Sequence, residues 1–111
     1  MNWILLLLAL IPQAIDRKPD RVISITAERF SFRPSKVVVQ EGQLIEFVLS
    51  SEDTSHGFRI QDTAIEVAIP QQGKGEARVR FQVNKKGRYV FECFRPCGAG
   101  HNLMRGTIEV R

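Results

Sequence analysis

The sequence lacks the features that mark several large classes of protein. With 111 residues it can build one modest core, and it has no room for a second domain. No apolar run approaches the roughly 20 residues with which a helix crosses a bilayer. No nucleophile, base and acid stand in a recognisable arrangement, and no paired carboxylates form a pocket motif, so an enzyme is not expected. The chain also contains only two cysteines and two histidines.

The longest apolar stretch stands at the start of the sequence. Residues 4–11 are all apolar, and the first charge after them is Asp16. Such a stretch is too short to span a bilayer and is typical of a secretory signal, and no nearby cysteine could carry a lipid. We therefore expect export to the periplasm or another extracytoplasmic space. The expected organisation is a signal peptide or short N-terminal anchor at 1–14, a linker at 15–21 and one domain at 22–111.

After the leader, apolar residues recur with a period of two. In residues 77–83 every second side chain is apolar and those between are polar or charged, which predicts a half-buried strand. Similar runs, separated by turn signals, lie at 22–26, 36–40, 44–50, 57–61, 65–69, 88–93 and 106–110. Five phenylalanines at apolar positions are expected in the core: Phe30, Phe32, Phe47, Phe81 and Phe91. Seven to eight short strands predict an all-β fold, an antiparallel Greek-key β-sandwich.

Metal-binding side chains are concentrated in one loop between two of these strands. Residues 93–104 carry Cys93, Cys97, His101 and Met104 with the spacing C-x3-C-x3-H-x2-M. Thiolate, imidazole and thioether are the soft ligands that select copper, whereas magnesium and calcium prefer carboxylates and water. Two glycines within the loop let it curl tightly enough for these side chains to converge.

A site of this type needs a ligand from elsewhere in the fold, and His56 is the other histidine. It lies at a loop that the sandwich can bring beside residues 93–104. Asp53, three positions earlier, could orient its imidazole. With only one of the two cysteines, the ligand set would form a mononuclear blue-copper centre. The second thiolate, from Cys93, allows two sulfurs to bridge two copper ions and therefore favours a binuclear centre.

Two simpler interpretations use the same residues. In an exported protein the two cysteines could form a disulfide and bind no metal. Two cysteines and two histidines could also hold a structural zinc ion. His101 and Met104 at ligand spacing weigh against the disulfide, and zinc does not require methionine. Phe94, inside the loop, could either shield the metal from water or pack in the core.

The loop and several other segments resemble the copper-A domain of cytochrome c oxidase subunit II, within the cupredoxin superfamily. The likeness covers about residues 22–111 and includes Phe-Ser-Phe-Arg-Pro at 30–34, Thr-Ser-His-Gly-Phe at 54–58 and Gly-Arg-Tyr at 87–89. The resemblance implies a cupredoxin-like Greek-key β-sandwich with two copper ions bridged by both cysteines. It further implies that His56 and Met104 complete one ion, and that His101 and the backbone carbonyl of Arg95 complete the other.

The sequence departs from this family in three respects. The leader is too short for a membrane-spanning hairpin, Arg95 stands where the family has an acidic residue, and Trp3, the only tryptophan, lies in the expected leader. We therefore expect a free-standing soluble relative rather than an oxidase core subunit.

Because the protein would fill every copper coordination position, we expect a one-electron carrier. Two alternatives remain: a copper chaperone or storage protein that delivers Cu(I) to an oxidase, and a mononuclear type 1 copper protein.

The expected redox partners are a c-type cytochrome or a terminal oxidase. A copper donor and a thiol reductase are expected for assembly, because a disulfide offers no thiolate ligand. The net charge of +4 predicts a solvated face or a patch that steers an acidic redox partner, and neither nucleic acid nor a membrane span in the mature domain is expected.

Overall fold

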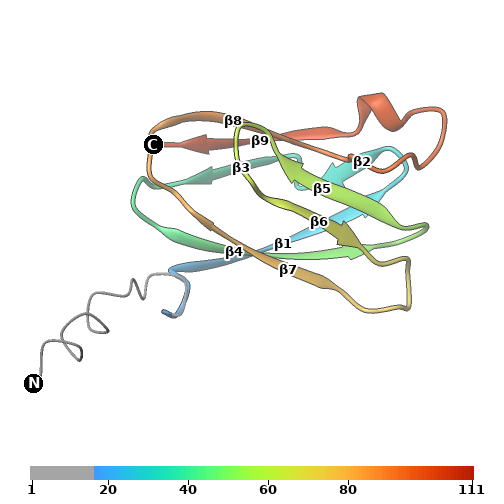
Figure 1. The fold of residues 1–111 in the computed structure, drawn as a ribbon, viewed down its shortest axis with the longest axis horizontal. Helices are drawn as coiled ribbons and strands as arrows, with labels where there is room; N and C mark the ends of the chain where they lie inside the picture. The colour runs from blue at the N-terminus through green and yellow to red at the C-terminus, as the bar shows by residue number, and fades with distance from the viewer. Residues whose placement is uncertain (1–16) are drawn as a thin grey trace, which may run out of the picture.

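The computed structural model describes residues 17–111, which form nine β-strands and one short 3-10 helix (Figure 1). The elements are β1 (Arg21–Glu28), β2 (Ser31–Arg33), β3 (Lys36–Val39), β4 (Leu44–Ser51), β5 (His56–Ile60), β6 (Glu66–Ile69), β7 (Ala77–Gln82), β8 (Gly87–Glu92), η1 (His101–Leu103) and β9 (Arg105–Val110). Within this part of the chain no helix has the length and apolar character needed to span a membrane. The expected leader at 1–14 and the first two residues of the expected linker lie outside the described residues.

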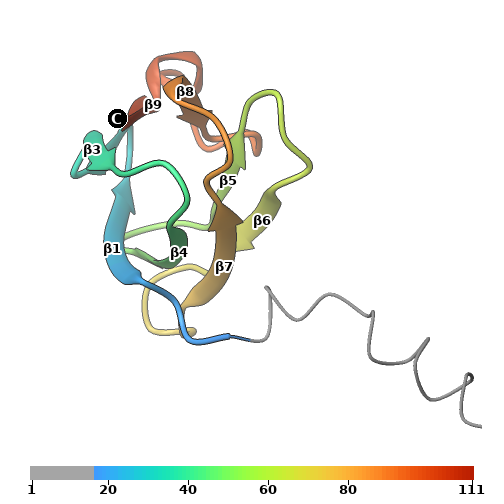
Figure 2. The same cartoon turned by 90° about the vertical axis from the view of Figure 1, so that its left-hand side faces the viewer.

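The strands form two sheets that pack face to face. One sheet has the order β2-β1-β4-β7, and the other has the order β3-β9-β8-β5-β6. Figure 2 shows the two layers enclosing a shared interior. The alternation in the sequence explains this arrangement, because β4 buries Ile45, Phe47 and Leu49 while the residues between them are only partly covered. The expected all-β sandwich is confirmed.

Four phenylalanines from both sheets meet in the core. Phe32 and Phe47 come from the first sheet, Phe58 and Phe91 come from the second, and all four are fully buried. The ring centroid of Phe58 lies 5.5 Å from that of Phe47 and 5.2 Å from that of Phe91. Because offset and edge-to-face aromatic pairs stabilise beyond the area they bury, this cluster stabilises the packing of the two sheets against each other. Phe30, also expected in the core, is only half-buried and lies next to the metal-binding loop.

Two features of the topology differ from the sequence-based expectation. All eight predicted strands are present, but β2 adds a ninth, which is three residues long and buries only Phe32, too short to display an alternation. β1 pairs with β4, and β3 pairs with β9, in parallel, so the expectation of a wholly antiparallel sandwich was wrong. The alternation tells which side chains face the core, but it holds no information about strand direction. The chain crosses to the second sheet for β3 and returns for β4, which then runs alongside β1.

This arrangement brings the metal-binding loop and His56 to the same end of the sandwich. Residues 93–104 connect β8 to its antiparallel neighbour β9. β5 pairs with the other edge of β8 and begins at His56. The amide of Cys93 donates a hydrogen bond to the carbonyl oxygen of Met104 at 3.2 Å and closes the base of the loop.

Candidate metal centre

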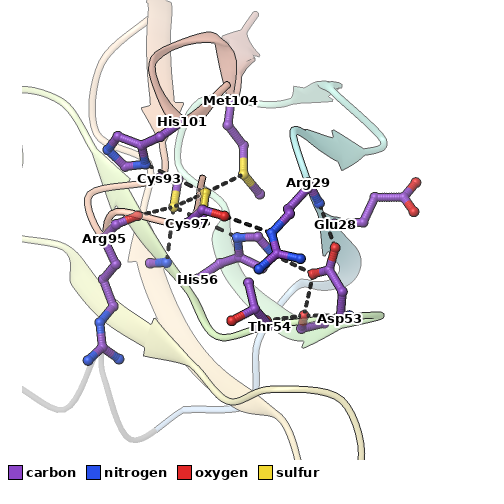
Figure 3. A network of polar contacts seen from close by, with 12 residues as sticks. Glu28, Arg29, Asp53, Thr54, His56, Cys93, Arg95, Cys97, His101 and Met104 are labelled. Atoms are coloured by element: carbon purple, nitrogen blue, oxygen red, sulfur yellow. Dashed lines mark hydrogen bonds and ion pairs between the residues drawn. The ribbon is translucent and has the colours of Figure 1, made fainter. Parts of the chain in front are cut away.

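Two cysteine sulfurs form the middle of the candidate site (Figure 3). The Sγ atoms of Cys93 and Cys97 lie 3.9 Å apart, and both thiols are free. A disulfide bond is about 2.05 Å long, so the two sulfurs are not bonded to each other in this structure. A metal–thiolate bond of about 2.3 Å, the length found for zinc, lets a single ion touch both sulfurs at the observed separation. The spacing therefore suits bridging by metal.

Each sulfur has an imidazole beside it. Nδ1 of His56 lies 4.0 Å from Sγ of Cys93, and Nδ1 of His101 lies 3.6 Å from Sγ of Cys97. The donor atoms of His56 and the two cysteines all lie within 4.8 Å of one another, close enough to hold one metal ion. The start of β5 and the loop after β8, distant in sequence, thus contribute to the same cluster.

Two further donor atoms lie next to the sulfurs. Sδ of Met104 is 3.9 Å from Sγ of Cys97. The thiol of Cys93 donates a hydrogen bond to the backbone carbonyl oxygen of Arg95 at 3.2 Å, while the Arg95 side chain points away from the sulfurs (Figure 3). The structure thus brings together all six groups that the sequence predicts as ligands. Their binding of copper stays a prediction.

The loop holds this shape through its own backbone. The amide of Leu103 donates to the carbonyl of Gly100 at 3.0 Å, and the amide of Met104 donates to the carbonyl of His101 at 3.2 Å, which forms the single turn of η1. Gly98 has a φ of 143°, in a region that side-chain-bearing residues rarely adopt. This tight turn returns the chain toward the cysteines, so that the His101 ring and the Met104 thioether both reach the Cys97 sulfur.

The candidate site is buried on one side and reaches solvent on the other. His56 and Met104 are fully buried, and each cysteine is 5% exposed, whereas His101 is only half-buried. Beside His101 lies a hollow of about 260 Å³, lined among others by Asn102 and by strand residues. Among the side chains predicted as ligands, His101 is therefore the one nearest to solvent.

Asp53 fixes the orientation of His56. Its Oδ1 lies 2.7 Å from Nε2 of His56, and its Oδ2 accepts a hydrogen bond from the amide of Arg29 at 2.8 Å. Burial alone would raise the pKa of Asp53, but the hydrogen bonds from the Arg29 amide and from His56 outweigh it and lower the pKa. The carboxylate is thus ionised at neutral pH and accepts hydrogen from Nε2. In the neutral imidazole this hydrogen bond leaves the lone pair on Nδ1, on the side of the sulfurs.

The Cys97 thiol is hard to ionise. Burial, reinforced by the neighbouring Cys93, raises the pKa of the Cys97 thiol from its usual 9.0 to about 11. Cys97 therefore stays protonated at neutral pH until a metal displaces the proton.

Three contacts at the site were not predicted from the sequence. The amide of Gly57 donates to Sγ of Cys93 at 3.4 Å. The half-buried Phe94 lies directly on Gly57, where a Cβ atom would come within 2.7 Å of its ring. Nε of Arg29 donates to the carbonyl oxygen of Cys97 at 2.7 Å. Because the two hydrogen bonds join residues 36 and 68 positions apart, no local spacing could have revealed them.

The donor set, its position at one end of a nine-stranded sandwich and the sequence as a whole agree with one family. The profile of the cupredoxin-like domain matches residues 2–110, nearly the entire chain. The chain belongs to the cupredoxin-like domain family. The expected cupredoxin fold is thereby confirmed.

The cupredoxin-like chain is similar to cytochrome c oxidase subunit 2 of Thermus thermophilus, with 34% identity over 90 residues. The match covers 80% of this chain and 64% of that protein, so the chain spans slightly less than two thirds of the length of its relative. Among solved structures, it is similar to the periplasmic domain of subunit II of cytochrome oxidase (CoxB) of Bradyrhizobium japonicum, with a TM-score of 0.76, 19% identity and 86% of each chain covered. It is also similar to subunit II of cytochrome c oxidase in a mixed disulfide intermediate with the thioredoxin-like TlpA. That comparison gives a TM-score of 0.68 and 18% identity and covers 86% of this chain and 84% of the other.

Proposed function

We propose that this protein is a single-electron carrier with a binuclear copper centre. In the proposed centre Cys93 and Cys97 bridge two ions. His56 and Met104 complete one ion, and His101 and the carbonyl oxygen of Arg95 complete the other. The observation that carries the proposal is the pair of free sulfurs 3.9 Å apart, each beside its own imidazole. A single ion needs only one of these thiolates in a blue-copper centre, so the second thiolate favours two ions.

The chemistry of the donor atoms supports copper over other metals. Sulfur and imidazole nitrogen are soft or borderline donors, and none of the six proposed ligands is a carboxylate. Zinc would have no use for the thioether of Met104. Copper bound here supplies a one-electron couple. In the proposed centre protein groups would fill the donor positions and leave none for a substrate, which favours electron transfer over catalysis.

Charge and exposure around the loop support docking of an acidic redox partner. Leu103 is 80% exposed beside His101, the predicted side-chain ligand nearest to solvent. Arg95 and Arg105 are exposed on the same loop and at its end, and residues 93–105 contain no Asp or Glu. A c-type cytochrome or a terminal oxidase with an acidic surface fits this face. The relatives that are oxidase subunits favour such a partner and an extracytoplasmic location for this chain.

Assembly requires both cysteines to be reduced before copper arrives. A disulfide between them would remove both bridging ligands, so a thiol reductase and a copper donor are proposed as assembly partners. The mixed disulfide of a related subunit II with a thioredoxin-like protein supports the first of these.

Copper loading of the reduced chain tests the proposal. We expect two coppers per chain, a coloured oxidised form, and an electron paramagnetic resonance pattern from one unpaired electron shared by two copper nuclei. The matched variant Cys93→Ser should bind one copper and give the pattern of a single nucleus, because only one thiolate remains. One copper per wild-type chain with a mononuclear signal would instead identify a type 1 protein. Cu(I) alone, with no stable oxidised form, would identify a copper-delivery protein.

A further inference from the structure

The turn between β1 and β2 lies against the metal-binding loop. Arg29, in this turn, contacts two separate parts of the candidate site. Its amide donates to Oδ2 of Asp53 at 2.8 Å, and its Nε donates to the carbonyl oxygen of Cys97 at 2.7 Å. Figure 3 shows the Arg29 side chain reaching from the turn toward the Cys97 carbonyl. One residue therefore links the carboxylate that orients His56 to the backbone that carries one of the two thiols.

Phe30, the next residue of the turn, covers the loop beyond Cys97. A Cβ atom added to Gly98 would come within 2.8 Å of the Phe30 ring, and one added to Gly100 within 2.4 Å. Cβ atoms do not approach other atoms this closely, so a side chain at either position would force the Phe30 ring or the loop to shift. The turn thus holds the loop by a hydrogen bond on one side of Gly98 and by an aromatic ring over Gly98 and Gly100.

We propose that Arg29 is a positioning residue that, together with Phe30, holds the metal-free loop with its two thiols at metal-binding separation and opposes their closure into a disulfide. Closing the bond would bring the sulfurs from 3.9 Å to about 2.05 Å. In this proposal closure draws the Cys97 backbone along with its sulfur, and the hydrogen bond from Arg29 to the Cys97 carbonyl resists that shift. Because a guanidinium is a charged donor, this is among the stronger hydrogen bonds available to a carbonyl. The inference deepens the proposed copper site and rests on it for its biological purpose.

The chain offers a matched control in the same hairpin. Arg33 lies in β2 and forms ion pairs with Glu28 and Glu52, and within residues 17–111 it makes no hydrogen bond or ion pair with the loop. Arg29→Met removes the donor but keeps the length of the side chain. Arg33→Met makes the same chemical change without touching the loop.

The test follows thiol oxidation in the reduced, metal-free full chain. Diamide is the oxidant: the two thiols give up two protons and two electrons, the Cys93–Cys97 S–S bond forms, and diamide is reduced to its hydrazine. We expect Arg29→Met to oxidise about tenfold faster than wild type, because loss of the charge-assisted hydrogen bond outweighs the higher Cys97 pKa that follows from removing the Arg29 charge. Arg33→Met should oxidise at the wild-type rate, and Arg29→Lys should recover part of the protection because its ammonium is also a donor. Equal rates for wild type and Arg29→Met would overturn the proposal.

Two further measurements separate this proposal from general destabilisation and from the copper assignment. Thermal unfolding shows whether Arg29→Met is still folded. If it is not, the oxidation rate of Arg29→Lys tests the positioning role in its place. After copper loading, Arg29→Met should have a lower reduction potential than wild type, because a positive charge near the centre favours the reduced state. Faster oxidation in a chain that binds no copper would leave the positioning role intact and refute the copper centre. An unchanged oxidation rate in Arg29→Met, in a chain that binds two coppers, would refute the positioning role and leave the copper centre intact.

Discussion

Asp53 decides which nitrogen of His56 is free to bind metal. The carboxylate, held ionised by the Arg29 amide and the imidazole itself, accepts hydrogen from Nε2 and leaves Nδ1 on the side of Cys93. A metal ligand whose second nitrogen is held in this way cannot rotate out of position without breaking a 2.7 Å contact.

Asp53→Asn should weaken copper binding by about tenfold or more, because an amide holds the imidazole less firmly than a carboxylate does. Competition against a Cu(I) chelator of known affinity measures the change. Glu52→Gln is the matched control, since Glu52 is adjacent in sequence, exposed, and paired with Arg33 rather than with the site. Equal affinities for wild type and Asp53→Asn would show that the contact has no part in ligand orientation.

The residues of the candidate site differ in how well the sequence predicts them. The spacing of the four loop residues predicts a shared site, because side chains on one short curled loop lie close together. His56 was found by elimination, since the chain has only one other histidine. Arg29 had no such signal, because its hydrogen bond to the Cys97 carbonyl depends on where the β1–β2 turn falls in three dimensions.

Among the strands, β5 and β8 are joined by a charged cluster just below the metal-binding loop. Glu92 of β8 accepts hydrogen bonds from Arg59 at 2.7 Å and from Gln61 at 2.9 Å, and Arg105 at the start of β9 lies 3.8 Å away. The hydrogen bond from Arg59 is the main reason that the pKa of Glu92 is lowered. The cluster therefore fixes the end of β8 from which Cys93 projects.

Glu92→Gln should lower the melting temperature of the domain at neutral pH by a few degrees and have little effect in acid. A carboxyl group whose pKa is lower in the folded state stabilises the fold above its unfolded pKa, here near 4.5, and loses that contribution as pH falls through the folded value. The difference between wild type and variant should therefore shrink below about pH 4.5. Glu41→Gln, on an exposed turn, serves as control. A difference that stays constant from pH 7 to about pH 3 would contradict a role for the charge.

Strand positions were predictable, but strand partners were not. The alternation located eight strands, because burial of one face imposes a period of two on each of them independently. The parallel pairing of Ile25 with Leu49 and of Val37 with Ile108 depends on how the chain crosses between sheets. Packing of the whole sandwich decides how the chain crosses, and no sequence pattern within a single segment predicts it.

The molecule as a whole distributes its charge unevenly around the candidate site. The excess of +4 includes two exposed arginines at the loop, Arg95 and Arg105, beside the exposed Leu103. Within residues 17–111 the Arg95 side chain makes no hydrogen bond or ion pair, whereas the Arg105 guanidinium lies 3.8 Å from the Glu92 carboxylate. Lys85 and Lys86 lie in the β7–β8 turn, at the opposite end of β8. Charge near the loop acts on a docking partner, while charge at the far end is screened within about 8 Å at physiological salt.

Electron exchange with small redox complexes should reveal this asymmetry. The copper-loaded protein should react faster with hexacyanoferrate, an anion, as ionic strength falls, and slower with hexaammineruthenium, a cation. Arg95→Gln should weaken both salt dependences, and Lys86→Gln should leave them nearly unchanged. Stopped-flow absorbance measures the rates. Identical salt dependence in the two variants would mean that the loop face does not steer partners.

The place of β9 has a consequence for how the molecule is made. β9 is last in chain order, yet it lies between β3 and β8, and its parallel partner Lys36 of β3 is separated from Thr107 by 71 positions. Contacts between such distant segments form late, because the intervening chain must first be ordered. A nascent chain therefore cannot close its second sheet before residues 105–110 have been synthesised. Only then does the loop before β9 gain its second anchor, so the proposed copper site forms only after the last strand of the domain is in place.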